Sequence, residues 1–115
     1  MTTTVLNVGK IIDSPSALTR EQGLLLQKEI ISCLNNNEKV VLDCNEIESS
    51  LTPFWNVSIG KLYDLFDEDM LSSHLSIIHE PEGTKSKLRL VISNAKQFYS
   101  NSNEFASIVK KAGVE

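Results

Sequence analysis

The sequence has little of what marks the specialised classes of protein chain. Its 115 residues include only two cysteines, three prolines and five glycines. Two cysteines without a CxxC spacing do not make a disulfide framework, and so little proline and glycine excludes a collagen-like or low-complexity chain. No apolar run approaches the roughly 20 residues of a membrane helix, and the first residues lack the pattern of a secretory signal. We therefore expect a cytoplasmic protein without a membrane segment.

Motifs of catalysis and of cofactor binding are also missing. The sequence contains no GxxxxGK[ST], GxGxxG, HExxH or GxSxG, so we expect no enzyme activity and no cofactor. His74 and His79 are five residues apart on a predicted strand, and their side chains therefore face opposite sides. The acidic run of residues 67–69 lacks the glycine and glutamate of a calcium loop. We expect no metal site, and Cys33 and Cys44 are most simply small core residues.

The residues that are present are typical of one globular domain spanning 1–115. Hydrophobic residues make up 41% of the chain and charged residues 23%, as in ordinary soluble domains. The charge is unevenly divided: residues 1–83 hold 13 acidic and 5 basic side chains, whereas residues 84–115 hold 2 acidic and 6 basic. This division predicts an acidic and a basic face, on either of which an oppositely charged partner can dock.

The first half of the chain alternates between strand and helix signals. Residues 3–8 predict a strand, with an extension through Ile12 left open. Thr19 and Gln22 form a capping box that begins a helix running to about Leu34, in which Gly23 allows close packing on a neighbour. Its apolar stripe consists of Leu26, Ile30, Cys33 and Leu34, widened by Leu24 and Ile31. The continuous apolar run 40–44 predicts a strand covered on both faces.

The second half continues the same alternation. Thr52 at the N-cap and Pro53 at the first helical position predict a helix to about residue 66, closed by the acids of residues 67–69. A strand over residues 74–79 follows, and the remaining predicted elements are a helix over 85–99, a break at 100–103 and a short helix over 104–112. The sequence therefore predicts an α/β fold: a mixed sheet of three to four strands with helices packed on it.

Several short motifs together resemble the STAS-like domain family of unknown function. The resemblance covers about residues 5–100 and is carried by Val40-Val-Leu-Asp43, Ile47, Thr52-Pro-Phe-Trp55 and Ile59-Gly-Lys-Leu-Tyr63. This bacterial and phage family is related to the STAS domains of anti-sigma factor antagonists. The resemblance implies a small STAS-like sandwich and a signalling role.

The resemblance also implies a phosphorylation switch at the start of a helix. In STAS domains a kinase of the GHKL ATPase type modifies a hydroxyl there, and the matching candidates in this chain are Thr52, Ser50 and Ser49. The usual Asp-Ser-Ser-Gly arrangement is absent, and Pro53 falls near the acceptor position. Thr52 as a plain helix cap is the favoured interpretation.

A docking face follows from the same comparison. We expect it between Glu46 and Lys61, with the partner-binding candidates Glu46, Glu48, Phe54, Trp55, Asn56 and Lys61. Trp55 is either an interface anchor or part of the core with Ile59, and the core is favoured. The leading hypothesis is a non-enzymatic regulatory module that binds a protein partner, such as a GHKL-type ATPase.

Two alternatives belong to other functional classes. One is a nucleic-acid-associated regulator, for which the cations are Lys85, Lys87, Arg89, Lys96, Lys110 and Lys111. It is disfavoured because the basic segment is short and lacks exposed aromatic residues between its cations. The other is the binding of a small nucleotide near Thr52 and Pro53, since helix N-termini accept phosphates.

Overall fold

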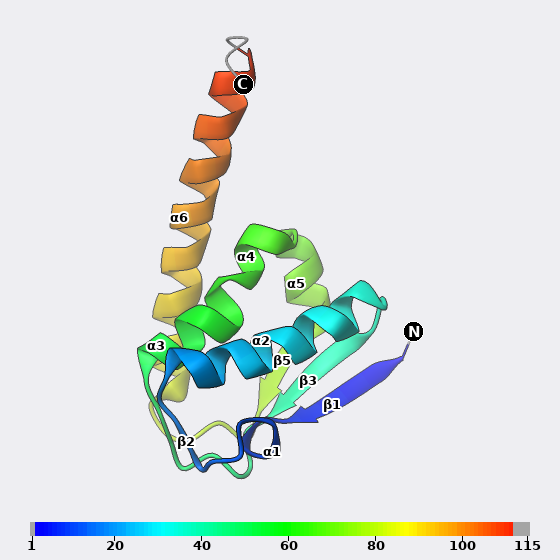
Figure 1. The fold of residues 1–115 in the computed structure, drawn as a ribbon, viewed down its shortest axis with the longest axis vertical. Coiled ribbons are helices and arrows are strands. Elements are labelled where there is room, and N and C mark those ends of the chain that lie inside the picture. Colours follow the sequence, from blue (N-terminus) through cyan, green and yellow to red (C-terminus); the bar gives the residue numbers. More distant parts are fainter. Residues whose placement is uncertain (1, 112–115) are drawn as a thin grey trace.

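The fold is built on a small parallel sheet. The computed structural model describes the backbone of residues 2–111 and the side chains of residues 2–99. Three parallel strands lie in the order β1–β3–β5, with bounds β1 Thr3–Asn7, β3 Lys39–Asp43 and β5 Leu75–Ile78 (Figure 1). Two short strands, β2 Ser16–Ala17 and β4 Ser49–Ser50, form a second parallel pair. The predicted α/β class is confirmed, and the described strand pairs are all parallel where a mixed sheet was expected.

Helices connect the strands and form the second layer. In chain order they are α1 Val8–Ile12, α2 Arg20–Asn35, α3 Thr52–Trp55, the π-helix η1 Asn56–Gly60, α4 Leu62–Leu65, α5 Glu68–His74 and α6 Thr84–Lys111. In Figure 1, α2 crosses in front of the sheet and α6 extends well beyond the rest of the molecule. Within the described residues, no helix combines the length and the apolar character needed to cross a membrane.

The beginning of α2 is fixed by its own sequence. The Gln22 backbone N–H donates to Thr19 Oγ1 at 3.1 Å, and Gln22 Oε1 accepts from the Thr19 backbone N–H at 2.9 Å. These two bonds satisfy N–H groups that a helix start otherwise leaves without a partner, which confirms the predicted capping box. Of the predicted apolar stripe, Leu26, Ile30, Cys33 and Leu34 are buried, whereas Leu24 is 46% exposed.

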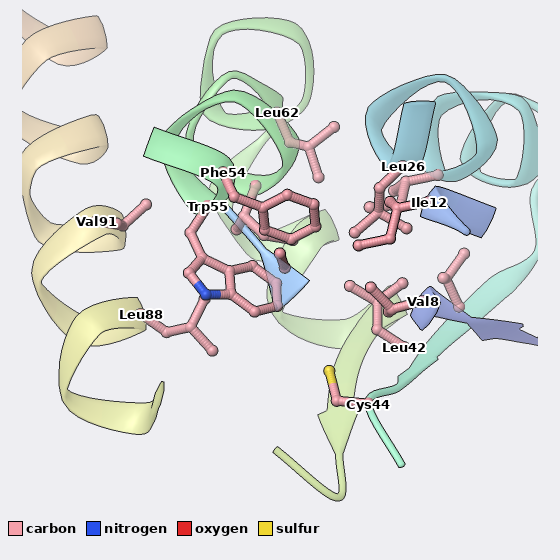
Figure 2. Close-up of a cluster of buried hydrophobic side chains, with 14 of the residues drawn as sticks. Val8, Ile12, Leu26, Leu42, Cys44, Phe54, Trp55, Leu62, Leu88 and Val91 are labelled. Carbon is pink, nitrogen blue, oxygen red and sulfur yellow. The ribbon is translucent and has the colours of Figure 1, made fainter. Parts of the chain in front are cut away.

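The hydrophobic core lies between one face of the sheet and the helices. Val40 and Leu42 of β3 point into it, and both are at most 1% exposed. Phe54 and Trp55 fill its centre between α6 and the side chains of α2 and the sheet (Figure 2). A buried aromatic side chain of this size contributes several kcal/mol to stability. Burial of Phe54 and Trp55, the last two residues of α3, therefore holds this helix against the core.

The other face of the sheet is open to solvent. Burial along β3 alternates, and on this face Val5 of β1 is 59% exposed and Ile78 of β5 is 37% exposed. The expectation that both faces of β3 are covered is therefore wrong. The predicted run of residues 40–44 is interrupted by Asp43, and its three consecutive apolar residues, Val40 to Leu42, fit a half-covered strand as well as a fully covered one.

Two cap residues decide one alternative that the sequence left open and correct one prediction. Residues 9–12 are not an extension of the first strand, because Asn7 Oδ1 accepts from the Lys10 N–H at 3.1 Å and begins α1. The acids of residues 67–69 do not end a helix. Asp67 is the N-cap of α5 and accepts from the Asp69 and Met70 N–H groups. Acidic side chains at a helix N-terminus are favourable with respect to the helix dipole.

The predicted break at residues 100–103 does not interrupt α6, whose backbone is helical from Thr84 to Lys111. Serine and asparagine each cost less than about 1 kcal/mol in a helix, and neither proline nor glycine occurs in this stretch. A polar segment of this kind weakens a helix without ending it.

Candidate functional site

The connection between β3 and α3 is held on one side by β2. The Asp43 carboxylate accepts from the Asn45 N–H at 2.9 Å at the end of β3. Ile47 is buried and fixes the middle of the connection in the core. β4 then pairs with β2, and the Leu51 N–H donates to the Ala17 carbonyl at 2.9 Å. The backbone that leads to α3 is therefore tied down at three points.

The first turn of α6 holds the same connection. The ammonium of Lys87 donates to the Ser50 carbonyl oxygen. The hydroxyls of Ser50 and Thr84 are 3.4 Å apart, and both residues are at most 3% exposed. A buried hydroxyl pair between β4 and α6 couples the approach to α3 with the long helix.

The start of α3 has no side-chain cap. Leu51 occupies the N-cap position, and Thr52 is the first helical residue and makes no capping hydrogen bond. The prediction that Thr52 is the cap is therefore wrong, although Pro53 does lie in the first turn. Phe54 and Trp55 follow directly, both 0% exposed, with their rings 4.8 Å apart in an edge-to-face arrangement. The helix start is fixed by burial rather than by local hydrogen bonds.

The helix beyond α3 widens into the π-helix η1 against α2. A Cβ placed on Gly23 would lie 2.8 Å from the Phe54 carbonyl oxygen and 3.0 Å from Val57 Cβ, so the predicted close approach at Gly23 is confirmed. Gln27 Nε2 donates to the Val57 carbonyl at 2.6 Å. π-Helical turns are rare and occur frequently at functional sites, and this one lies on the predicted docking face.

The structure separates the predicted site residues into two groups. Glu46, Glu48, Ser49 and Asn56 are exposed, and Thr52 and Lys61 are half-buried. Phe54, Trp55 and Ser50 are buried. Phe54 and Trp55 therefore cannot form part of a contact surface in this conformation, a correction to the predicted docking face. The favoured interpretation of Trp55 as a core residue is confirmed.

Lys61 lies at the C-terminal end of the predicted docking face. Its ammonium contacts the Asp64 carboxylate at 2.7 Å and lies 5.7 Å from the centre of the Tyr99 ring. The hydrogen bond to Asp64 raises the pKa of Lys61. The side chain is thus a positively charged group held by two neighbours.

A polar cluster at the carboxyl ends of the strands was not predicted. Asn7 Nδ2 donates to Glu46 Oε2 at 2.8 Å, and His79 Nδ1 lies 2.9 Å from Asp43 Oδ1. The hydrogen bond with His79, followed by that from the Asn45 N–H, lowers the pKa of Asp43. Parallel strands bring their carboxyl ends to one edge of a sheet. Once β1, β3 and β5 are known to be parallel, this rule predicts that the polar residues that follow them lie close together.

The groups considered for metal binding or nucleophilic chemistry do not form a site. Among residues 2–99, no three His, Cys, Asp or Glu side chains are placed to hold a metal ion. Cys33 and Cys44 are both buried. Burial raises the pKa of the Cys44 thiol to about 12, which disfavours the reactive thiolate.

Most basic side chains in the first half of α6 are occupied. Lys96 pairs with Glu68 at 2.9 Å and Lys85 with Glu80 at 3.6 Å. Lys87 holds the Ser50 carbonyl, and Arg89 is exposed. Lys110 and Lys111 lie outside the residues whose side chains are described. Nucleic-acid binding stays a prediction, which a gel shift at increasing salt would test, since binding through phosphates weakens steeply with salt.

Comparison with protein families identifies a related domain family. A family model described as a STAS-like domain of unknown function (DUF4325) matches residues 22–84, more than half of the chain. The matched region runs from the first turn of α2 to the first residue of α6 and includes the whole β3–α3 connection. The chain matches no curated protein and no solved structure.

Proposed function

We propose that this chain, which belongs to the family of STAS-like domains of unknown function, is a non-enzymatic regulatory module that docks on a partner protein. The observation that carries the proposal is the β3–α3 connection: its backbone is tied to β2 and to α6, while the side chains of Glu46, Glu48 and Ser49 are exposed to solvent. A surface that is ordered before binding loses little conformational entropy when a partner docks.

The docking face consists of the exposed and half-buried residues of this stretch, Glu46, Glu48, Ser49, Thr52, Asn56 and Lys61. Two carboxylates lie near its beginning and one ammonium at its end, and this charge pattern favours a partner with complementary charges. We further propose, from the relation to STAS domains, that the partner is an ATPase or kinase of the GHKL type.

Phosphorylation at this face is the second part of the proposal. Thr52 and Ser49 are its acceptors, because the Ser50 hydroxyl is buried against Thr84. A phosphate adds close to two negative charges at neutral pH. The ammonium of Lys87, bound to the Ser50 carbonyl, stands beside this segment. A phosphate there would change the charge that the docking face presents to its partner.

The docking proposal is tested by capturing proteins from host-cell lysate with the tagged chain. The variant Asn56→Arg/Lys61→Glu changes the docking face without touching the core. Ser76→Arg is the matched control, since Ser76 is exposed on the open face of the sheet. We expect a specific protein to be captured by the unchanged chain and by the control but lost with the double variant. Equal capture by all three would place the docking face elsewhere.

The phosphorylation proposal is tested on the chain purified from host cells with phosphatases inhibited. We expect mass spectrometry to find phosphate on Thr52 or Ser49, and Thr52→Glu to reduce capture of the partner. A phosphorylated Ser50, or full capture by Thr52→Glu, would contradict this part while leaving the docking proposal intact.

A further inference from the structure

A pocket of about 380 Å³ lies between α2, η1 and the Tyr99 ring of α6. We name it the α2–η1 pocket, and it is lined by Arg20, Leu24, Gln27, Pro53, Asn56, Val57, Lys61 and Tyr99. Its size falls within the range of small-molecule sites in proteins. A second hollow of about 280 Å³ adjoins it and shares Asn56 and Tyr99.

The walls of the α2–η1 pocket are fixed by contacts already described. The close approach at Gly23 sets the spacing of α2 and η1, and the Gln27 side chain is bound to the Val57 carbonyl. On the opposite side, Lys61 lies over the Tyr99 ring and pairs with Asp64. The pocket is therefore preformed, which reduces the entropic cost of binding.

The lining combines an apolar wall with positive charge. Leu24, Pro53, Val57 and the Tyr99 ring supply the apolar and aromatic surface. Arg20 and Lys61 supply two cations, of which Lys61 is already paired with Asp64. Among the residues whose side chains the structure describes, no carboxylate lines the pocket and Arg20 has no ion-pair partner. A hollow of about 270 Å³ beside α1 contrasts with it, because Asp13 and Glu46 line that one together with Lys10.

We propose that the α2–η1 pocket binds a small organic anion with an aromatic body. The aromatic ring lies against Leu24, Val57 and Tyr99, and the anionic head, a carboxylate or phosphate, is held by Arg20. The guanidinium fork of arginine fits either head with two parallel hydrogen bonds. The Asn56 side chain supplies a further polar contact for an oxygen or nitrogen of the ligand.

The test is a titration of the isotope-labelled full chain followed by NMR. The probes are indole-3-acetate and its neutral counterpart indole-3-acetamide, which keeps the ring and removes the charge. We expect saturable shifts of the Gln27, Asn56 and Val57 signals with the acid, and binding of the amide at least about tenfold weaker, since a hydrogen bond to a charged group contributes about 1.5–3 kcal/mol. Equal binding of acid and amide would overturn the proposal.

Two variants locate the anionic head. Arg20→Gln removes the charge at the pocket, and Lys28→Gln removes one from an exposed position of α2 that does not line it. We expect about tenfold weaker binding for Arg20→Gln and unchanged binding for Lys28→Gln. Both positions are exposed, so both variants should fold. Equal affinities, or shifts confined to other residues, would overturn the proposal. Phenyl phosphate in place of indole-3-acetate tells which head group the pocket prefers.

Discussion

The first turns of α2 and α3 are stabilised in different ways. At residues 19–22, the capped start, Thr19 and Gln22 bond the free N–H groups of the helix with their own side chains. At residues 51–55, the packed start, no side chain caps the helix, and burial of Phe54 and Trp55 holds it in place. As a result, the half-buried Thr52 makes no capping hydrogen bond. A helix start that is stabilised by buried side chains keeps its polar side chains available to bind a partner. In a capped start, those side chains are already hydrogen-bonded to the backbone.

Trp55→Ala should have the largest effect, because it removes the anchor of the packed start. Truncating a fully buried tryptophan typically costs about 3–5 kcal/mol, and urea unfolding of the purified chain measures it. Phe98→Ala is the matched control, since that aromatic side chain is 64% exposed and its loss should cost less than about 0.5 kcal/mol. A loss below about 1 kcal/mol for Trp55→Ala would mean that burial does not fix α3.

Gly23→Ala tests the contact between the two helices. Alanine favours a helix over glycine by about 1 kcal/mol, but the new Cβ would press on the Phe54 carbonyl, which is backbone and cannot move aside easily. Overpacking costs about 1–3 kcal/mol, so we expect a net loss of about 1 kcal/mol in thermal or urea unfolding. Net stabilisation would show that α2 and η1 separate at little cost.

Replacing the two threonines compares the helix starts directly. Thr19→Ala should destabilise the chain by about 1 kcal/mol, because it removes the cap. Thr52→Ala should change stability by less than about 0.5 kcal/mol, because its hydroxyl makes no cap. Equal losses in parallel unfolding curves would mean that Thr52 does cap α3.

Acidification should have the smallest effect on stability. It acts on Asp43 at the end of β3, where the connection to the packed start begins. The hydrogen bond with His79 lowers the folded-state pKa of Asp43. The bond's contribution to stability is therefore present above the unfolded pKa of about 3.9, and it is lost as the pH falls through the folded value. In unfolding curves measured from pH 6 downward, stability should fall slightly more for the unchanged chain than for Asp43→Asn. An equal loss of stability in the two chains would show that the Asp43–His79 hydrogen bond does not stabilise the fold.

The features predicted correctly from sequence are those whose cause is local. The capping box of Thr19 and Gln22 lies within four residues, and the apolar stripe of α2 follows helical spacing. Gly23 indicated a close contact because glycine is unfavourable inside a helix unless the space is needed by a neighbour. The strand before Asp43 was likewise visible in a short segment, and so was a helix start near Pro53, although the helix begins one residue earlier, at Thr52. The family resemblance rested on these same segments.

The features missed depend on distant partners. The β2–β4 pair is two residues long and has no sequence signature, yet it fixes the approach to α3. Helical spacing buries Trp55 but gives no reason to bury its neighbour Phe54, which is buried because α3 packs against both α2 and α6. The Asp43–His79 contact joins residues that are 36 positions apart and required the strand order. Binding sites of this kind are visible only after the chain is folded.

The central claim is that the docking face is the surface through which this STAS-like domain works. Its most direct test is a photo-crosslinking side chain placed at Asn56 in the intact chain, irradiated in host cells, with the same group at Ser76 for comparison. The account predicts a discrete crosslinked complex with one protein from position 56 and none from position 76. A complex formed from position 76 alone would contradict it and move the working surface to the open face of the sheet.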